Sequence, residues 1–190
     1  MARPFLTARW RHLAMLNWPV APEVVEPFVP RGTALDFFQG RTFLSVVGFL
    51  FLDARVRGWA IPFHRHFEEV NLRFYVKRGD RRGVVFVKEL VPRAAIAWVA
   101  RAVYGENYEA VPMSHAVSDV AVRYAWRYRG REMSIDLEPA GPFEDLPAGS
   151  EAEFIAEHYW GYASRKDGST VEYRVEHPRW RVATAARASL

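Results

Sequence analysis

Four side chains of different chemistry share one face of a predicted strand. Over residues 69–76 the apolar residues Val70, Leu72, Phe74 and Val76 alternate with Glu69, Asn71, Arg73 and Tyr75. An acid, an amide, a guanidinium and a phenol on one face suit the binding of a small polar molecule. Residues two apart on a strand face lie ~6.6 Å apart, so Glu69 and Arg73 are about 13 Å apart and each needs another partner. We take Glu69 and Arg73 as the candidate catalytic residues, with a solvated outer face as the alternative.

Histidine and tyrosine side chains elsewhere in the chain could complete such a site. They supply proton donors and acceptors near neutral pH, although aromatic residues also pack at strand ends without any function. The candidate ligand-binding residues are Asn71, Tyr75, Tyr108, His115, His158 and His177.

A metal site is considered and not expected. His64 and His66 could chelate one metal if they share a strand face, but strand alternation places Glu69 on the opposite face, and Pro62 favours a loop. The chain has no cysteine to act as a ligand. We therefore expect neither a metal nor a cofactor.

Lys88 is the single lysine on a predicted strand. A lysine among apolar neighbours can lose its charge and form a Schiff base. Alternation places Lys88 on a face with Val84, Phe86 and Leu90. We expect this face to pack in the same layer as Val70, with the Lys88 amine in water or on a carboxylate.

Composition predicts one domain over residues 1–190. Hydrophobic residues make up 50% of the chain and aromatic residues 15%, which provides a substantial core. The absence of cysteine fits a reducing compartment. The first residues resemble no signal peptide, and the longest apolar run, 43–52, is too short to span a membrane. These features predict a soluble cytoplasmic protein without a membrane partner.

The net charge of +4 is spread along the chain. One dense basic patch, 77–83, contains two glycines and an aspartate and reads as a solvated hairpin turn. A nucleic-acid-binding protein would concentrate its basic residues on one element. We expect a small-molecule ligand and no nucleic acid, and a homo-oligomer stays open.

The strands and helices that would position these residues indicate an α+β fold. Hydrophobic periodicity and turn signals predict two helices, 94–104 with Gly105 as its stop and 150–158 with a capping box at its start, and a short helical stretch near 23–28. The many strands predict a large antiparallel sheet, and their length favours closure into a barrel or cone with a few flanking helices. The predicted strands are 42–53, 55–61, 69–77, 84–91, 108–116, 120–127, 132–138, 159–165 and 170–177.

Several segments form a recognisable series along the chain: 16–20, 67–76, 83–86, the helix end at 100–101, Tyr108 with Met113, and the closing 177–180. Taken in this order, they resemble the YqjF-like family of uncharacterised bacterial proteins. That family is similar in fold to acetoacetate decarboxylase, a β-cone whose interior holds the active site. The resemblance covers nearly the whole chain and implies that the Glu69 face points into a cavity.

One departure from acetoacetate decarboxylase bears on the chemistry. In that enzyme a pair of adjacent lysines follows the corresponding helix, and one of them forms the Schiff base. Here segment 105–110 contains no lysine. The resemblance therefore implies a polar cavity that binds a small, anionic, oxygenated metabolite, with any catalysis by acid and base and not through an imine. Arg73 would hold the anion, Glu69 would act as the acid or base, and Asn71 and Tyr108 would orient the ligand. The alternative is a binding or interaction module without catalysis.

Overall fold

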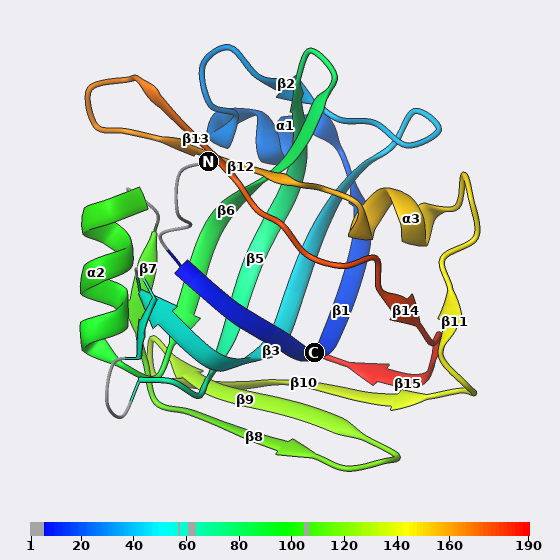
Figure 1. The fold of residues 1–190 in the computed structure, drawn as a ribbon. Helices are drawn as coiled ribbons and strands as arrows, with labels where there is room; N and C mark the ends of the chain where they lie inside the picture. Colours follow the sequence, from blue (N-terminus) through cyan, green and yellow to red (C-terminus); the bar gives the residue numbers. More distant parts are fainter. Residues whose placement is uncertain (1–5, 57, 61–63, 105–106) are drawn as a thin grey trace.

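A long, mostly antiparallel sheet forms the centre of the molecule. The computed structural model describes residues 6–56, 58–60, 64–104 and 107–190 (Figure 1). The strands of this main sheet follow the order β1-β3-β5-β6-β12-β13. Their bounds are β1 Leu6–Val20, β3 Thr42–Val56, β5 Phe67–Arg78, β6 Arg81–Val91, β12 Trp160–Ser164 and β13 Thr170–Arg174. Three short strands pair beside this path: β2 Ala34–Leu35, β4 Trp59–Ala60 and β7 Tyr108–Ala110.

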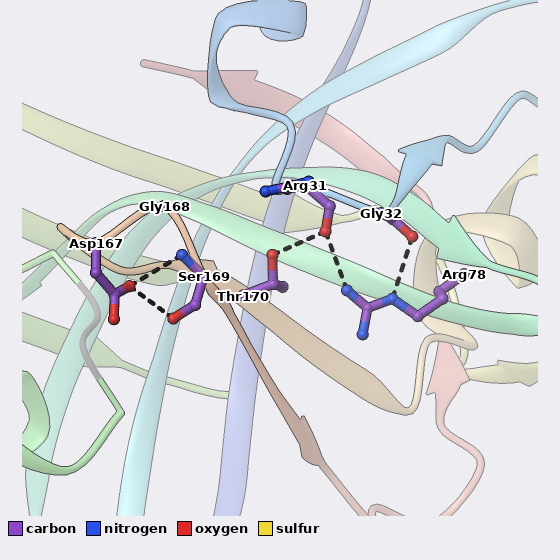
Figure 2. Close-up of a pocket in the computed structure, with 7 residues that line it drawn as sticks. All are labelled: Arg31, Gly32, Arg78, Asp167, Gly168, Ser169 and Thr170. Atoms are coloured by element: carbon purple, nitrogen blue, oxygen red, sulfur yellow. Dashed lines mark hydrogen bonds between the residues drawn. The ribbon is translucent and has the colours of Figure 1, made fainter.

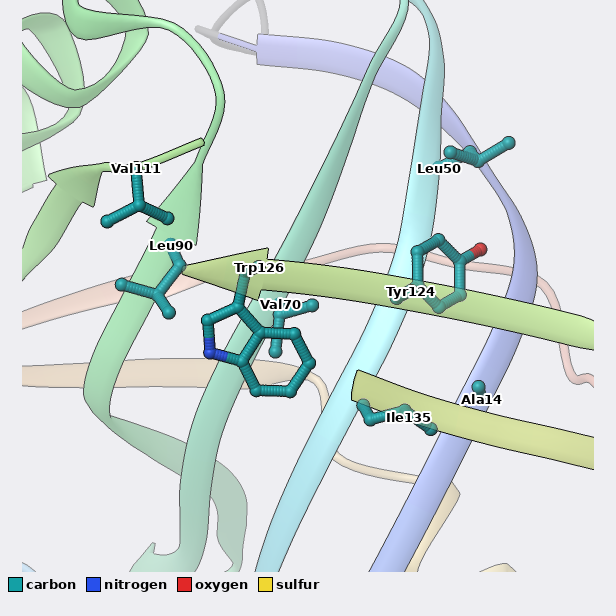
Figure 3. Close-up of a cluster of buried hydrophobic side chains, with 8 residues drawn as sticks. All are labelled: Ala14, Leu50, Val70, Leu90, Val111, Tyr124, Trp126 and Ile135. Carbon is teal, nitrogen blue, oxygen red and sulfur yellow. The ribbon is translucent and has the colours of Figure 1, made fainter. Parts of the chain in front are cut away.

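A second sheet packs across one face of the main sheet, in the order β15-β10-β9-β8. Its strands are β8 Met113–Val117, β9 Val122–Tyr128, β10 Arg131–Pro139 and β15 Ala185–Ser189. Tyr124 and Trp126 of β9 and Ile135 of β10 meet Val70 and Leu90 of the main sheet in a buried cluster (Figure 3). A third sheet consists of two short strands, β11 Glu144–Asp145 and β14 Arg181–Val182.

Helices and a C-terminal segment cover the opposite face of the main sheet, which we call the interior face. It carries Glu69, Asn71, Arg73 and Tyr75. Helix α2, Ala94–Tyr104, places Ala97 against Val47, Phe49 and Val91, and α3, Glu151–Ala156, places Phe154 and Ile155 against Phe43, Tyr75 and Val84. The segment between β13 and β14 crosses in front of the sheet in Figure 1, and its Trp180 lies 6.1 Å from the ring of Trp10.

The two faces of β5 are both buried, and this explains why its polar residues are not solvated. Phe74 and Val76 pack with Val25 of the short helix α1, Pro22–Val25, which a 3-10 turn, Glu26–Phe28, extends. Tyr75, on the other face, packs against α3. The alternative of an exposed, solvated outer face is therefore wrong.

A β-bulge in β6 shifts the pairing between β5 and β6. Leu72 pairs with Lys88, whereas Arg73 pairs with Phe86, so Val87 is one residue more than the partner strand has. The extra residue restarts the alternation. Lys88 consequently shares the Leu72 face, while Phe86 shares the Arg73 face. The prediction that Lys88 and Phe86 lie on one face is wrong for this reason.

Most predicted elements are confirmed, with differences at particular residues. The predicted strand 108–116 divides at Val111 and Pro112: β7 pairs parallel with β6, whereas β8 joins the second sheet. Pro112 has no N–H to continue a ladder, which accounts for the break. The long strand β1 was not among the predicted strands. The expected stop at Gly105, the loop at Pro62 and parts of the predicted strand 55–61 lie outside the described residues.

One antiparallel sheet was expected, whereas the described strands form three sheets. Two strands, β7 and β12, pair with β6 in parallel. Among the described residues, the pairing path of the main sheet runs from β1 to β13 and does not close on itself. Helix α3 begins as its capping box predicts, since the Ser150 hydroxyl accepts a hydrogen bond from the Glu153 amide at 3.1 Å.

Candidate functional site

Glu69 lies at the centre of a buried polar group on the interior face. The residue is 2% exposed. The Tyr108 hydroxyl donates to Glu69 Oε2 at 3.0 Å, and Asn71 Nδ2 donates to Oε1 at 3.1 Å. Asn71 and Tyr108 were predicted to orient a ligand, and contacts between them and Glu69 were not among the predictions. These contacts fix the orientation of the carboxyl group before any ligand arrives.

Arg73 lies two residues further along the same face and is 7% exposed. Its guanidinium lies 5.7 Å from the centre of the Tyr75 ring. Among the described residues, no carboxylate forms an ion pair with Arg73, and its buried Nε has no hydrogen-bond partner. The same holds for Oδ1 of Asn71. Buried donors and acceptors are nearly always paired, because leaving one unpaired costs about 1–3 kcal/mol.

Tyr75 joins a short chain of hydrogen bonds that crosses three strands. Its hydroxyl lies 2.7 Å from the Ser45 hydroxyl, which donates to Asn17 Oδ1 at 2.6 Å. Ser45 pairs with Arg73 across β3 and β5, and Asn17 pairs with Ser45 across β1 and β3. Ser45 stands in no motif of the sequence, and Asn17 lies in segment 16–20 but was not among the candidate site residues.

His158, directly after α3, lies against the Tyr75 ring with centroids 4.7 Å apart. Arg82 holds it in place: Arg82 Nε donates to Asp36 Oδ2 at 2.6 Å, and Nη2 lies 3.3 Å from His158 Nε2. Burial lowers the pKa of His158 to about 4, and the positive charges of Arg82 and Arg73 act in the same direction. Burial acts to raise the pKa of Asp36, but its contacts with His158 and Arg82 outweigh this and hold the pKa below its usual value.

Glu89 is a second buried carboxyl group on the interior face and was not among the candidate residues predicted from the sequence. It is 1% exposed, and it pairs with Asn71 across β5 and β6 and with Tyr108 across β6 and β7. Alternation from Lys88 already placed Glu89 on the opposite face from the lysine. If Lys88 packs in the layer of Val70, then Glu89 must lie on the same side of the sheet as Asn71, and this reasoning from the sequence would have identified Glu89 as a candidate.

Two of the predicted ligand-binding histidines lie apart from this group. His115 is exposed on β8, in the second sheet, with Nδ1 3.2 Å from Glu68 Oε2, so it belongs to the other face of the main sheet. His177 stacks on Trp180 at 4.0 Å and on Tyr159 at 4.6 Å. It lies in the segment that covers the interior face, next to Trp10, and aromatic packing accounts for its position.

None of the three lysines is buried on the interior face; Lys77 has the strand parity of Tyr75 but lies at the exposed rim of that face. Lys77 is exposed near the end of β5, and Lys166 is exposed in the turn between β12 and β13. Lys88 forms an ion pair with Glu109 and lies 3.3 Å from Asn107 Oδ1. The prediction that its amine lies on a carboxylate is confirmed.

The histidine pair considered for a metal lies at the edge of the structure. His66 is exposed, and its Nδ1 accepts a hydrogen bond from the Asp53 amide at 3.3 Å. Among the described residues, no group of three or more His, Cys, Asp or Glu side chains is arranged to hold a metal ion.

Two surface hollows, of about 440 and 380 Å³, are lined by none of Glu69, Asn71, Arg73 and Tyr75. The larger is drawn in Figure 2, where the carbonyl oxygen of Arg31 accepts hydrogen bonds from Arg78 at 3.1 Å and Thr170 at 2.8 Å. Asp167 accepts from Ser169 in the same hollow. These groups satisfy one another, so the hollow is a junction between the β12–β13 hairpin and the loop before β2. An enclosed cavity beside Glu69 stays a prediction.

Basic residues 78–82 do not form a free basic surface. Arg78 and Arg81 both form ion pairs with Glu172, and Arg82 reaches Asp36. The expectation of a merely solvated hairpin is therefore wrong for these arginines.

The sequence profile of the DUF2071 family, described as an uncharacterised conserved protein, matches residues 7–190. The chain belongs to the DUF2071 family. One relative of this DUF2071 chain is the uncharacterised protein YqjF of Bacillus subtilis (strain 168), which is 32% identical over 78 residues. That match covers 40% of this chain and 32% of YqjF, so it spans about a third of the relative's length.

Solved structures of acetoacetate decarboxylase type share the fold of this DUF2071 chain. An acetoacetate decarboxylase superposes with a TM-score of 0.66 at 11% identity, covering 98% of this chain and 74% of the other. The enzyme of Legionella pneumophila superposes with a TM-score of 0.59 at 11% identity, covering 86% and 61%. The enduracididine biosynthesis enzyme MppR superposes with a TM-score of 0.64 at 12% identity, covering 87% and 64%. The predicted relation to the YqjF-like family and to this fold is confirmed.

In the described part of the chain, none of the helices has the length and apolar character needed to span a bilayer.

Proposed function

We propose that the interior face binds a small, anionic, oxygenated metabolite, with Arg73 contacting its anionic group. The observation that carries this proposal is the buried Nε of Arg73, which has no hydrogen-bond partner among the described residues. A buried guanidinium without a carboxylate is costly unless something negative joins it. A ligand carboxylate would supply that charge and accept from the guanidinium in two places.

The neighbouring residues have distinct roles in this proposal. Asn71, whose Oδ1 also lacks a partner, would accept a hydrogen bond from a hydroxyl or enol of the ligand. Glu69 would exchange a proton with the ligand, since Tyr108 and Asn71 hold its carboxyl group in one orientation. An imine route has no support, because Lys77 and Lys166 are exposed and the Lys88 amine pairs with Glu109 on the other face of the sheet. The named structural neighbours act on or bind small oxo acids, acetoacetate and pyruvate among them, which favours this ligand class.

This proposal includes the shape of the site and its setting. The main sheet, with α2, α3 and the segment between β13 and β14 over its interior face, would form a cone around the ligand in one domain. The absence of cysteine is in keeping with a reducing, cytoplasmic setting.

Binding can be tested by titrating sodium pyruvate into the protein in a calorimeter. Arg73→Met keeps the approximate length of the side chain and removes its charge. A hydrogen bond between charged groups contributes about 1.5–3 kcal/mol, so we expect binding to weaken about tenfold or more. Arg127→Met, at an exposed ion pair on β9, is the matched control and should bind as the wild type does. Equal affinity of Arg73→Met and wild type would refute the proposal.

Catalysis by Glu69 can be separated from binding alone with the same compound. If Glu69 removes a proton from the methyl group of pyruvate, an enolate forms, and in D₂O a deuteron returns in its place. We expect the protein to accelerate this exchange, followed by NMR, and Glu69→Gln to abolish it while pyruvate still binds. Binding without accelerated exchange would favour the non-catalytic alternative.

A further inference from the structure

Two charged side chains contact Nε2 of His158. Arg82 Nη2 lies 3.3 Å from it and also donates to the Phe154 carbonyl oxygen at 3.3 Å, whereas Asp36 Oδ2 lies 3.4 Å from it and already accepts from Arg82 Nε at 2.6 Å. A guanidinium has only donors, so the Arg82 contact favours a lone pair on Nε2, whereas the Asp36 contact favours a proton there. Because the Arg82 contact is the shorter and Asp36 Oδ2 already accepts from Arg82, the arrangement favours a neutral ring with its proton on Nδ1.

In that tautomer the Nδ1–H of His158 is a donor without an acceptor among the described residues. His158 is 5% exposed, and its Nδ1 is buried with no hydrogen-bond partner among the described residues. The ring lies against Tyr75, and the Arg73 guanidinium lies over the same tyrosine. Two buried, unpaired donors, Arg73 Nε–H and His158 Nδ1–H, thus border one aromatic side chain.

We propose that Arg73 and neutral His158 together bind the carboxylate of the ligand, and that Arg82 is a positioning residue that keeps the His158 proton on Nδ1. This inference rests on the proposed function and deepens it. The charged groups around His158 are Asp36, Arg82 and Arg73, and its lowered pKa keeps the ring neutral near pH 7. One uncompensated arginine on a face that also carries Glu69 and Glu89 matches a monoanion better than a phosphate dianion.

The tautomer is measured directly by long-range ¹⁵N–¹H NMR of uniformly ¹⁵N-labelled protein, with His158 assigned from the spectrum of a His158 variant. At pH 7 without ligand, we expect a protonated-type shift for Nδ1 and an unprotonated-type shift for Nε2. Sodium pyruvate should move the Nδ1 resonance, and sodium phosphate should not compete. Arg82→Met should mix the two tautomers. A protonated Nε2 with a bare Nδ1, or a doubly protonated ring, would overturn the inference.

Two variants then separate the roles of the two ring nitrogens. The amide of Asn reaches the position of Nδ1, whereas the amide of Gln reaches that of Nε2. We expect His158→Asn to keep pyruvate affinity within about threefold and His158→Gln to lose about tenfold. Wild-type affinity in His158→Gln, combined with lost affinity in Arg73→Met, would overturn this inference and leave the proposed function standing. No pyruvate binding by wild-type protein would overturn both.

Discussion

Burying a neutral histidine makes the stability of the protein depend on pH. Burial, followed by the charges of Arg82 and Arg73, lowers the pKa of His158 from 6.5 to about 4. Between these values the unfolded chain binds a proton at this residue and the folded chain does not. The free energy of unfolding therefore rises with pH in this window, and the contribution is present above pH 6.5 and lost as the pH falls toward 4.

The size of the effect follows from the shift. A change of 2.5 pKa units corresponds to about 3 kcal/mol at most. Evaluated between pH 7.5 and pH 4.5, the loss for one such histidine is about 2–3 kcal/mol. The His158 side chain is 1% exposed, so solvent does little to screen this contribution. With a urea dependence of ~2 kcal/mol/M, the unfolding midpoint should fall by about 1 M over this range.

Urea unfolding of wild type and His158→Asn, followed by tryptophan fluorescence at several pH values from 7.5 to 4.5, tests the prediction. The variant should show a flatter dependence, because Asn does not titrate. Asp36, whose pKa is lowered by its contacts with His158 and Arg82, loses its contribution at lower pH, and the variant keeps the Arg82 contact. The exposed His66→Asn is the control and should keep the wild-type slope. Parallel curves for wild type and His158→Asn would refute the reasoning.

Two further predictions concern packing and chemistry. A Cβ at Gly48 would lie 2.5 Å from the ring of Tyr124, which is fully buried, so Gly48→Ala should destabilise the protein by about 1–3 kcal/mol, measured by urea unfolding. Gly141→Ala, with open space around its Cβ, is the matched control and should be neutral; an equally neutral Gly48→Ala would contradict the packing described. Borohydride reduction in the presence of acetoacetate should leave Lys88 unmodified by mass spectrometry, since its amine is engaged by Glu109 on the far face; a mapped adduct would restore imine chemistry.

Local patterns predicted much of the fold because they act within a few residues. The alternation of 69–76 is read from the sequence alone, and the structure places Glu69, Asn71, Arg73 and Tyr75 on one buried face as expected. The turn between β5 and β6 and the cap of α3 depend on neighbouring residues as well. β1 escaped prediction because its pattern is interrupted: the pairing shifts between Arg11 and Ala14, and His12 has a positive φ of 55°.

The partners of the site residues depend on contacts across the chain, and no local pattern reveals them. His158 was a candidate from its residue type, but Asp36 and Arg82, which hold it, are 122 and 76 residues away in sequence. His115 was chosen by the same criterion of residue type, and the break at Pro112 carries it into the second sheet. Residue type alone could suggest His158 and His115 as candidates, but only the pairing of the strands shows which of them lies beside Tyr75.

The extra residue in β6 gives this strand two independent halves. From Arg81 to Phe86, the pairing that begins at the β5–β6 hairpin determines which face of the sheet each side chain occupies. From Lys88 onward, the pairing with Leu72 and Asn71 determines it. A related chain that lacks Val87 would keep a carboxylate inside and the amine outside. A chain of equal length in which the ladder ran without interruption would turn Lys88 inward, opposite Asn71, and expel Glu89. One change of register, with no change of residue type, would thus exchange an acidic interior for one that carries an amine.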